Sequence, residues 1–185
     1  TWKLVPKQPM GVMASHAEFD STGALYISYG DGPGPNNVMD GAVWKYQPKL
    51  EKFTNITPAA PKAGDTFGYG GLSVDAAHPG TLMVSTIDRW THGDEVYRTT
   101  DDGKTWKALF PKVVRDDAGA KYLYWHKPND PIGRGWMGDI DIDPFNPGRV
   151  MYVTGQGIWG SEDANAADSD KPTHWKLIDR GHEQT

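Results

Sequence analysis

Apolar and polar residues alternate in short runs along this chain, and no run has the long 3.6-residue apolar spacing of a helix. In the run TLMVST at 81–86, Leu82 and Val84 fall on one side of an extended strand and Met83 falls on the other. Both sides are largely apolar, as in a sheet that is covered on both faces. The pattern therefore predicts an all-β fold of short strands with almost no helix.

A tight polar turn joins two β-type runs in the stretch Glu95–Phe110. The turn, DDGK at 101–104, contains a glycine, which favours a β-hairpin. The residues that fit the pattern Ser/Thr-x-Asp-x-Gly-x-Thr-Trp are Thr99, Asp101, Gly103, Thr105 and Trp106. The pattern resembles an Asp-box, also called a BNR repeat. In the families that carry it, the Asp-box is a structural hairpin between the third and fourth strands of a β-propeller blade.

Three stretches repeat one arrangement of strands and turns, and such repetition is typical of propellers. In each, an inner strand ends at an aspartate, a turn with a glycine follows, and three more strands come after it. The aspartates are Asp20, Asp75 and Asp143, and the glycines are Gly23, Gly80 and Gly148. An aspartate that begins a turn accepts hydrogen bonds from backbone N–H groups. The aromatic residues that recur on the later strands, and for which core packing is expected, are Trp44, Trp106, Trp159 and Trp175.

The repeats predict a partial β-propeller over residues 1–185, with about three blades of four antiparallel strands and one stray strand. The predicted parts are the last strand of a preceding blade at 1–5, blades at 12–57, 70–110 and 139–179, and a loop insertion at 111–138. Known propellers close with about four to eight blades. We therefore expect the remaining blades to come from the parent chain or from other chains.

The composition argues against several classes of function. The 185 residues carry a net charge of −5 with scattered lysine and arginine, so nucleic acid is not an expected partner. The chain has no cysteine, hence no disulfide and no thiolate metal site, and no apolar run is long enough to span a membrane. Its six histidines lack the paired spacing of a zinc enzyme. We expect no metal and no cofactor.

Longer stretches resemble glycoside hydrolase family 74. They are GVMASHAEFDSTGALYISYGDGPGP at 11–35, FGYGGLSVD at 67–75, HPGTLMVST at 78–86 with the pair Arg89–Trp90, and GWMGDIDIDPFNPGRVMYVTGQGIWGSED at 135–163. The resemblance covers Pro6 to about Ile178. It implies a secreted enzyme, extracellular or periplasmic, that acts on xyloglucan or another β-1,4-glucan. Such enzymes have two seven-bladed propellers with the substrate cleft between them. This chain would be a middle-to-late part of the first propeller, which is incomplete here.

The resemblance assigns no catalytic residue to this chain. In the family two aspartates invert the anomeric centre: the base lies in a Thr-Asp-Val-Gly-Gly type stretch of an early blade, and the acid lies in the second propeller. Neither stretch occurs here, so we expect this segment alone to be inactive. Two other classes stay open: a non-catalytic Asp-box propeller that binds glycans or proteins, and a scaffold assembled from several short chains.

Candidate substrate contacts lie in the loops and at the inner strands. A pyranose ring presents an apolar face that stacks on aromatic side chains. The aromatic candidates are Trp90, Trp136, Trp125, Tyr124 and Tyr69, and the polar candidates are His16 and Asp139. For each of them a structural role is the alternative. Asp88, beside Arg89 and Trp90, is a weaker candidate for a substrate contact, and a surface ion pair is its simpler interpretation.

Overall fold

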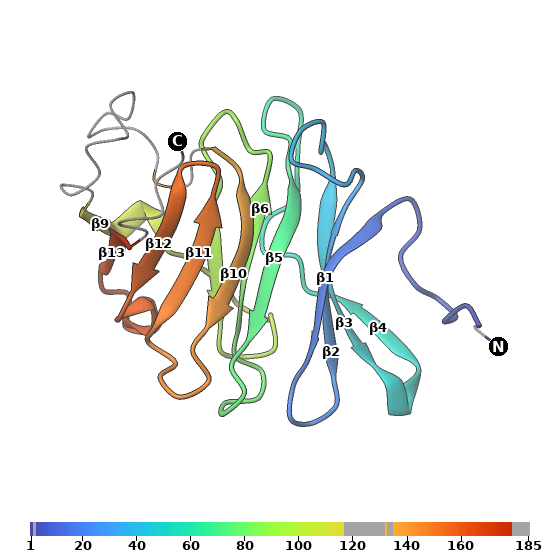
Figure 1. Cartoon of the computed structure of the whole chain (residues 1–185). Helices are drawn as coiled ribbons and strands as arrows, with labels where there is room; N and C mark the ends of the chain where they lie inside the picture. Colours follow the sequence, from blue (N-terminus) through green and yellow to red (C-terminus); the bar gives the residue numbers. More distant parts are fainter. Residues whose placement is uncertain (2, 117–131, 133–134, 179–185) are drawn as a thin grey trace.

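The strands form three separate sheets that stand side by side (Figure 1). The computed structural model describes residues 1, 3–116, 132 and 135–178. Blade 1 contains β1 (Met13–Phe19), β2 (Leu25–Gly30), β3 (Gly41–Gln47) and β4 (Lys52–Asn55). Blade 2 contains β5 (Gly68–Val74), β6 (Leu82–Ile87), β7 (Val96–Thr99) and β8 (Lys107–Ala108). Blade 3 contains β10 (Met137–Ile142), β11 (Val150–Thr154), β12 (Gly157–Ser161) and β13 (Thr173–Leu177). The prediction of four-stranded antiparallel sheets is confirmed.

A fifth strand, β9 (Val113–Asp116), extends blade 3 by pairing in parallel with β13. This differs from the sequence-based expectation, which treated 111–138 as irregular from its first residue. The chain leaves blade 2 through a 3₁₀ helix, η2 (Phe110–Lys112), and then runs along the open edge of blade 3. Covering the edge satisfies backbone groups that would otherwise remain unpaired.

Helical structure among the described residues is limited to η2 and two other 3₁₀ helices, η1 (Pro48–Leu50) and η3 (Ala164–Ser169). The expectation of almost no helix is confirmed. No described helix has the length and apolar character needed to cross a membrane. Residues 3–5 lie outside the assigned strands. Because the described chain supplies no earlier blade for them to join, the stray strand stays a prediction.

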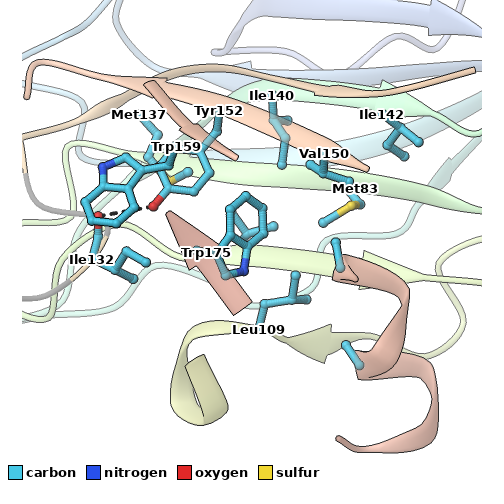
Figure 2. Packing of buried hydrophobic residues seen from close by; sticks show 13 residues of the cluster. Met83, Leu109, Ile132, Met137, Ile140, Ile142, Val150, Tyr152, Trp159 and Trp175 are labelled. Carbon is cyan, nitrogen blue, oxygen red and sulfur yellow. Dashed lines mark hydrogen bonds between the residues drawn. The ribbon is translucent and has the colours of Figure 1, made fainter. Parts of the chain in front are cut away.

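The hydrophobic core lies between the blades, and β6 contributes to both parts of it. Leu82 and Val84 belong to the cluster shared by blades 1 and 2, while Met83 belongs to the cluster shared by blades 2 and 3. The alternation predicted for 81–86 is therefore confirmed. Figure 2 shows the second cluster, in which the fully buried Trp159 and Trp175 pack around Tyr152. Both tryptophans have the core role expected of them.

The end of the sheets where β1, β5 and β10 finish is stabilised by aspartates. Asp20 Oδ1 accepts hydrogen bonds from the backbone N–H groups of Thr22 and Ala24 at 2.9 and 3.0 Å. Asp75 and Asp143 make equivalent bonds to the residues two positions ahead. The predicted turn role of all three is confirmed, and we call this end of the molecule the turn end.

The β7–β8 hairpin at the turn end, named here the Asp101 turn (residues 99–106), is closed by side chains. Asp101 Oδ1 accepts the backbone N–H of Thr105 at 2.8 Å, and Thr99 Oγ1 accepts the N–H of Gly103 at 3.0 Å. Trp106 Nε1 donates to the carbonyl of Ile56 in blade 1, at 2.8 Å. The hairpin predicted for this stretch is present, and it also attaches blade 2 to blade 1.

A longer version of the same turn joins β12 to β13, and we name it the Asp163 turn (residues 161–175). Asp163 Oδ1 accepts the backbone N–H of His174 at 2.8 Å, and Asp163 Oδ2 lies 2.6 Å from His174 Nδ1. Ser161 takes the place that Thr99 has in the Asp101 turn. The Ser161 Oγ accepts the backbone N–H of Asp163 and donates a hydrogen bond to the Asp163 carboxylate. The extra residues form η3, whose Ala164 and Ala167 are buried in the core.

Candidate functional site

A cleft of about 410 Å³ opens where the inner strands of the three blades begin, at the opposite end from the turns. Its lining comes from β1, β5 and β10, the β2–β3 loop and the end of β6, and includes Ser15, His16, Gly32, Pro33, Gly70, Ile87, Gly138 and Asp139. His16 Nδ1 lies 3.4 Å from Asp139 Oδ1, although the two residues belong to blades 1 and 3. The cleft therefore brings together two of the predicted polar candidates.

Glycines of β5 make this approach of blades 1 and 3 possible. A Cβ at position 71 would lie 2.7 Å from the backbone nitrogen of Ile140, closer than packed atoms tolerate. A Cβ at position 70 would meet the carbonyl of Met137 at 3.3 Å. The absence of side chains at Gly70 and Gly71 thus lets β10 pack directly on β5 and leaves room for the cleft above them.

Trp90 stands on the β6–β7 loop, residues 88–95, which follows the cleft residue Ile87. Its indole is 64% exposed, yet its Nε1 donates a hydrogen bond to Asp88 Oδ1. Asp88 is itself buried, with a left-handed backbone (φ 67°), and its Oδ2 accepts the N–H of Val38 from the β2–β3 loop at 2.8 Å. The buried carboxylate joins two loops and holds the edge of an exposed aromatic ring.

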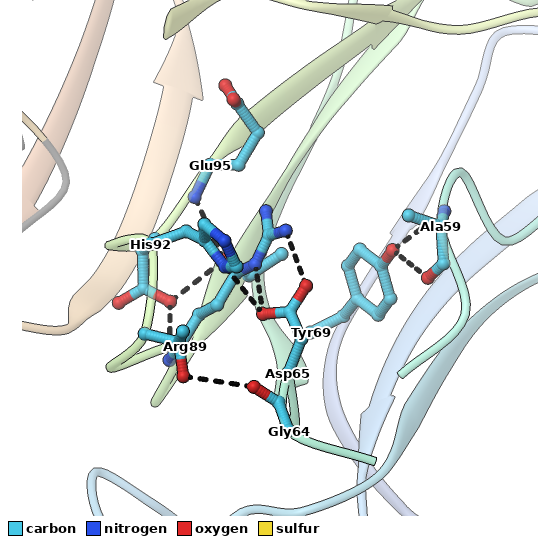
Figure 3. A network of polar contacts seen from close by, with 10 residues as sticks. Ala59, Gly64, Asp65, Tyr69, Arg89, His92 and Glu95 are labelled. Carbon is cyan, nitrogen blue, oxygen red and sulfur yellow. Dashed lines mark hydrogen bonds and ion pairs between the residues drawn. The ribbon is translucent and has the colours of Figure 1, made fainter. Parts of the chain in front are cut away.

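The other side of this loop is attached to the segment before β5, as Figure 3 shows. Arg89 forms a two-point ion pair with Asp65, at 2.9 and 2.7 Å, and His92 Nδ1 lies 3.2 Å from the same carboxylate. The hydrogen bond from Arg89 lowers the pKa of Asp65 to about 2. The guanidinium also lies 4.9 Å from the ring centre of Phe67. These contacts restrict the backbone on both sides of Trp90.

Asp94 connects the same loop to blade 3. Its Oδ1 accepts bonds from Thr86 Oγ1 and the N–H of Arg89, and its Oδ2 accepts the N–H of Met137 at 3.1 Å. Burial raises the pKa of Asp94 to about 6 in spite of these donors. The loop that carries Trp90 is therefore bonded to the residue that follows Trp136.

Glu95, the next residue, is buried as well. Its Oε1 accepts the N–H groups of Val96 and Phe110 at 2.9 and 3.0 Å, and burial raises its pKa to about 7. Carboxyl groups with raised pKa values often mark functional sites. Here the groups are enclosed and their oxygens face main-chain donors, so their role is to hold the loops in place.

Trp136 precedes β10 and is 37% exposed. A Cβ at position 155 would lie 3.1 Å from its Cζ2, so the indole rests on the bare backbone of Gly155 in the β11–β12 turn. The N–H of Gly155 donates to the carbonyl of Gly135 at 2.7 Å, which fixes that turn against the residue before the tryptophan. We use the name rim for the β2–β3 loop, the β6–β7 loop, residues 135–136 and the β11–β12 turn.

Comparisons with known proteins give one consistent result. The chain is 35% identical to a xyloglucanase from a Paenibacillus species over all of this chain and 19% of that protein. It is 38% identical to xyloglucanase Xgh74A of Acetivibrio thermocellus over 92% of this chain and 22% of that protein. The crystal structure of the GH74 xyloglucanase from Xanthomonas campestris superposes with a TM-score of 0.82 and 38% identity, over 96% of this chain and 24% of that one. No family model matches the sequence.

This chain is a segment of glycoside hydrolase family 74. The predicted resemblance and the predicted β-propeller architecture are therefore confirmed. The segment spans about a fifth of the length of the curated relatives that it matches.

The GH74 segment places four of the seven predicted contacts at the cleft or the rim: Trp90, Trp136, His16 and Asp139.

Tyr69 requires a correction. It is fully buried, and its hydroxyl donates to the carbonyl of Ala59 at 2.6 Å and accepts that residue's N–H at 3.1 Å (Figure 3). It therefore stabilises the segment before β5 instead of facing a ligand. The neighbouring glycines allow a close approach of backbone, as described above for β10. Tyr124 and Trp125 lie outside the described residues.

Sequence reasoning missed the carboxylates that shape the rim. Asp88 was expected in a surface ion pair, but it is buried and binds Trp90 and Val38, while Arg89 pairs with Asp65. The local sequence places Asp88 between a predicted strand and Trp90, but this position does not show that Asp88 is buried. Within the described parts of the chain, no group of three or more acidic or histidine side chains is arranged to hold a metal ion.

Proposed function

We propose that this chain forms one wall of the glycan-binding cleft in a longer protein that hydrolyses xyloglucan or a related β-1,4-glucan. The substrate class is supported by similarity, over nearly the whole segment, to proteins named xyloglucanases. The observation that carries the placement is the rim, where Trp90 and Trp136 stay exposed while hydrogen bonds fix their loops. An ordinary surface loop would have little reason to hold an exposed indole in one orientation.

In this proposal the two rim tryptophans and the two polar cleft residues each have a simple role. The indoles of Trp90 and Trp136 stack on pyranose rings, and the His16 imidazole and Asp139 carboxylate form hydrogen bonds with sugar hydroxyls in the cleft. Inverting hydrolysis needs an acid and a base carboxyl group about 6.5–9.5 Å apart on either side of the scissile bond. We assign neither of them to this segment, which binds the glycan while other parts of the protein cleave it.

The test uses the longer protein with xyloglucan, unbranched β-1,4-glucan and mixed-linkage β-glucan, and measures new reducing ends. We expect release from xyloglucan, and we expect Trp90→Ala and Trp136→Ala each to raise KM about tenfold, equivalent to about 1.4 kcal/mol. The matched control is Phe145→Ala, because Phe145 is 95% exposed at the turn end. Binding without any cleavage would favour a non-catalytic glycan-binding propeller, and the absence of both would end the proposal.

We also propose that the protein acts outside the cytoplasm, because its expected substrate is a plant cell-wall polymer that does not cross a cell membrane. Fractionation of the producing cells should place the xyloglucan-degrading activity in the medium or the periplasm. Activity confined to the cytoplasmic fraction would contradict this.

A further inference from the structure

Asp88 has a combination of properties that a loop aspartate rarely shows. It is 6% exposed, it takes a left-handed backbone conformation, and each of its carboxylate oxygens accepts one N–H group. One donor is the main chain of Val38, fifty residues earlier. The other is the indole of Trp90, two residues later. A buried carboxylate is tolerated only when hydrogen-bond donors surround it. The Asp88 carboxylate therefore requires both of these bonds.

The bond from Trp90 is not needed to satisfy the indole. Most of that side chain is exposed, so water could accept the Nε1–H group at little free-energy cost. What the bond does is restrict the rotamers of a side chain that would otherwise move freely in solvent. The backbone beside it is held too, because the N–H of Arg89 donates to Asp94 and its side chain pairs with Asp65.

We propose that Asp88 is a positioning residue that preorganises the Trp90 indole as a stacking platform for the glycan. The inference rests on the proposed function and deepens it by naming the group that sets the orientation of the platform. Ordering a side chain on binding costs about 0.5–1.5 kcal/mol. A platform that is already ordered avoids this cost and binds more tightly by about 3–10-fold.

Two single variants and their combination test the inference. Asp88→Asn keeps the shape of the side chain, but its amide has a single acceptor oxygen, so one of the two bonds is lost. The bond from Trp90 should be the one lost, because water can accept the exposed indole N–H but cannot reach the N–H of the fully buried Val38. Trp90→Phe keeps an aromatic face, removes the indole N–H and leaves Val38 untouched. In the longer protein, each should raise the Kd for a xyloglucan oligosaccharide with a four-glucose backbone about 3–10-fold. Because Asp88→Asn and Trp90→Phe break the same bond, the Kd of the double variant should be no higher than the higher of the two single-variant Kd values. In the longer protein KM should rise while kcat stays unchanged.

The matched control is Asp31→Asn. Asp31 Oδ1 accepts the N–H of Met39 at 2.8 Å in the same β2–β3 loop, without contacting an indole. It should leave the Kd unchanged. If Asp31→Asn weakens binding as much as Asp88→Asn, or if the double variant shows additive losses, Asp88 acts through the fold of the loop and the inference is wrong.

Trp90→Ala separates the inference from the proposed function. A weaker affinity in Trp90→Ala together with normal affinity in Asp88→Asn and Trp90→Phe would overturn the positioning role alone. An unchanged affinity in Trp90→Ala would remove Trp90 from the binding surface and overturn both. Weaker affinity in all three variants, with a non-additive double variant, is the expected result.

Discussion

Carboxylates shape both the turn end and the rim of this GH74 segment, but the two ends use them differently. At the turn end the aspartates accept hydrogen bonds from residues ahead of them in the chain; Asp101, Asp143 and Asp163 stay partly exposed, while Asp20 and Asp75 are buried. At the rim Asp88, Asp94 and Glu95 are buried. The same chemical group closes a local turn in one place and joins distant loops in the other.

The directions of the pKa shifts follow this difference. Hydrogen bonds outweigh the effect of burial at Asp101 and Asp163, so the pKa of each lies below its usual value. At Asp94 and Glu95 burial is the larger effect, and it raises their pKa values to about 6 and about 7. The comparison indicates that ionised Asp101 and Asp163 stabilise their turns, whereas ionisation of Asp94 and Glu95 opposes folding of the rim.

The largest expected effect comes from removing the Asp94 side chain. Asp94→Ala leaves Thr86 Oγ1 and the N–H groups of Arg89 and Met137 without their acceptor. Each buried group left unpaired costs about 1–3 kcal/mol, so we expect the opening free energy of the rim to fall by about 3 kcal/mol or more. Native-state hydrogen exchange of the 88–95 and 137–140 amides measures this directly.

Two variants calibrate that result. Asp94→Asn retains one acceptor oxygen and should lose less than Asp94→Ala. Asp101→Ala, at the turn end, should lower the opening free energy of its own hairpin by only about 1–2 kcal/mol, because water replaces the lost acceptor. Equal losses in Asp94→Ala and Asp101→Ala would show that the deeper burial of Asp94 does not increase the cost of removing it.

The second prediction concerns pH. Groups with a raised folded-state pKa contribute stability at low pH, and that contribution disappears as pH rises through the folded-state value. Asp94 and Glu95 should therefore make the rim more resistant to opening when pH falls from about 8 to about 5, by on the order of 1 kcal/mol from Asp94 and about 2–3 kcal/mol from Glu95. Asp101 and Asp163 have lowered pKa values, so their contribution is constant in that window and is lost only at more acidic pH.

Hydrogen exchange at several pH values, corrected for the intrinsic exchange rates, would show this contrast in one sample. Replacing Asp94 by asparagine and Glu95 by glutamine should abolish the pH dependence at the rim and leave the turn end unaffected. A rim that becomes easier to open on mild acidification would contradict the assignment of raised pKa values.

Sequence reasoning succeeded at the turn end because the contacts there are local and repeated. Asp20 binds residues two and four positions ahead, and Asp75 and Asp143 bind residues two positions ahead, so the pattern is visible in the chain itself. The strands and blades were predictable for the same reason. The alternation in β6 indicates a strand covered on both faces before any partner is known.

The rim could not be predicted in this way because its contacts join residues far apart in the sequence. Asp65 and Arg89 are 24 residues apart, Met137 and Asp94 are 43 apart, and Val38 and Asp88 are 50 apart. Nothing in the local sequence shows that Asp88 is buried. Tyr69 was misjudged for a different reason: its partner Ala59 is only ten residues away, but it lies in an irregular segment outside the strand pattern.

The smallest expected effect tests what closes the turns. The carboxylate binds a residue four positions ahead in the Asp101 turn and eleven ahead in the Asp163 turn, yet it accepts a backbone N–H at 2.8 Å in both. The second partner differs: Thr105 Oγ1 in one turn and the imidazole of His174 in the other. We infer that the backbone bond closes the turn and that the side-chain partner contributes little.

His174→Thr should then change the opening free energy of β13 by no more than about 0.5 kcal/mol, because an exposed side-chain ion pair contributes little. The imidazole is 64% exposed, and the substitution keeps the backbone N–H that Asp163 binds. Asp163→Ala removes that acceptor and should cost about 1 kcal/mol in the same amides. If His174→Thr instead costs as much as Asp163→Ala, the imidazole is an essential part of the longer turn. The two turns would then be closed by different interactions in spite of their matching backbone geometry.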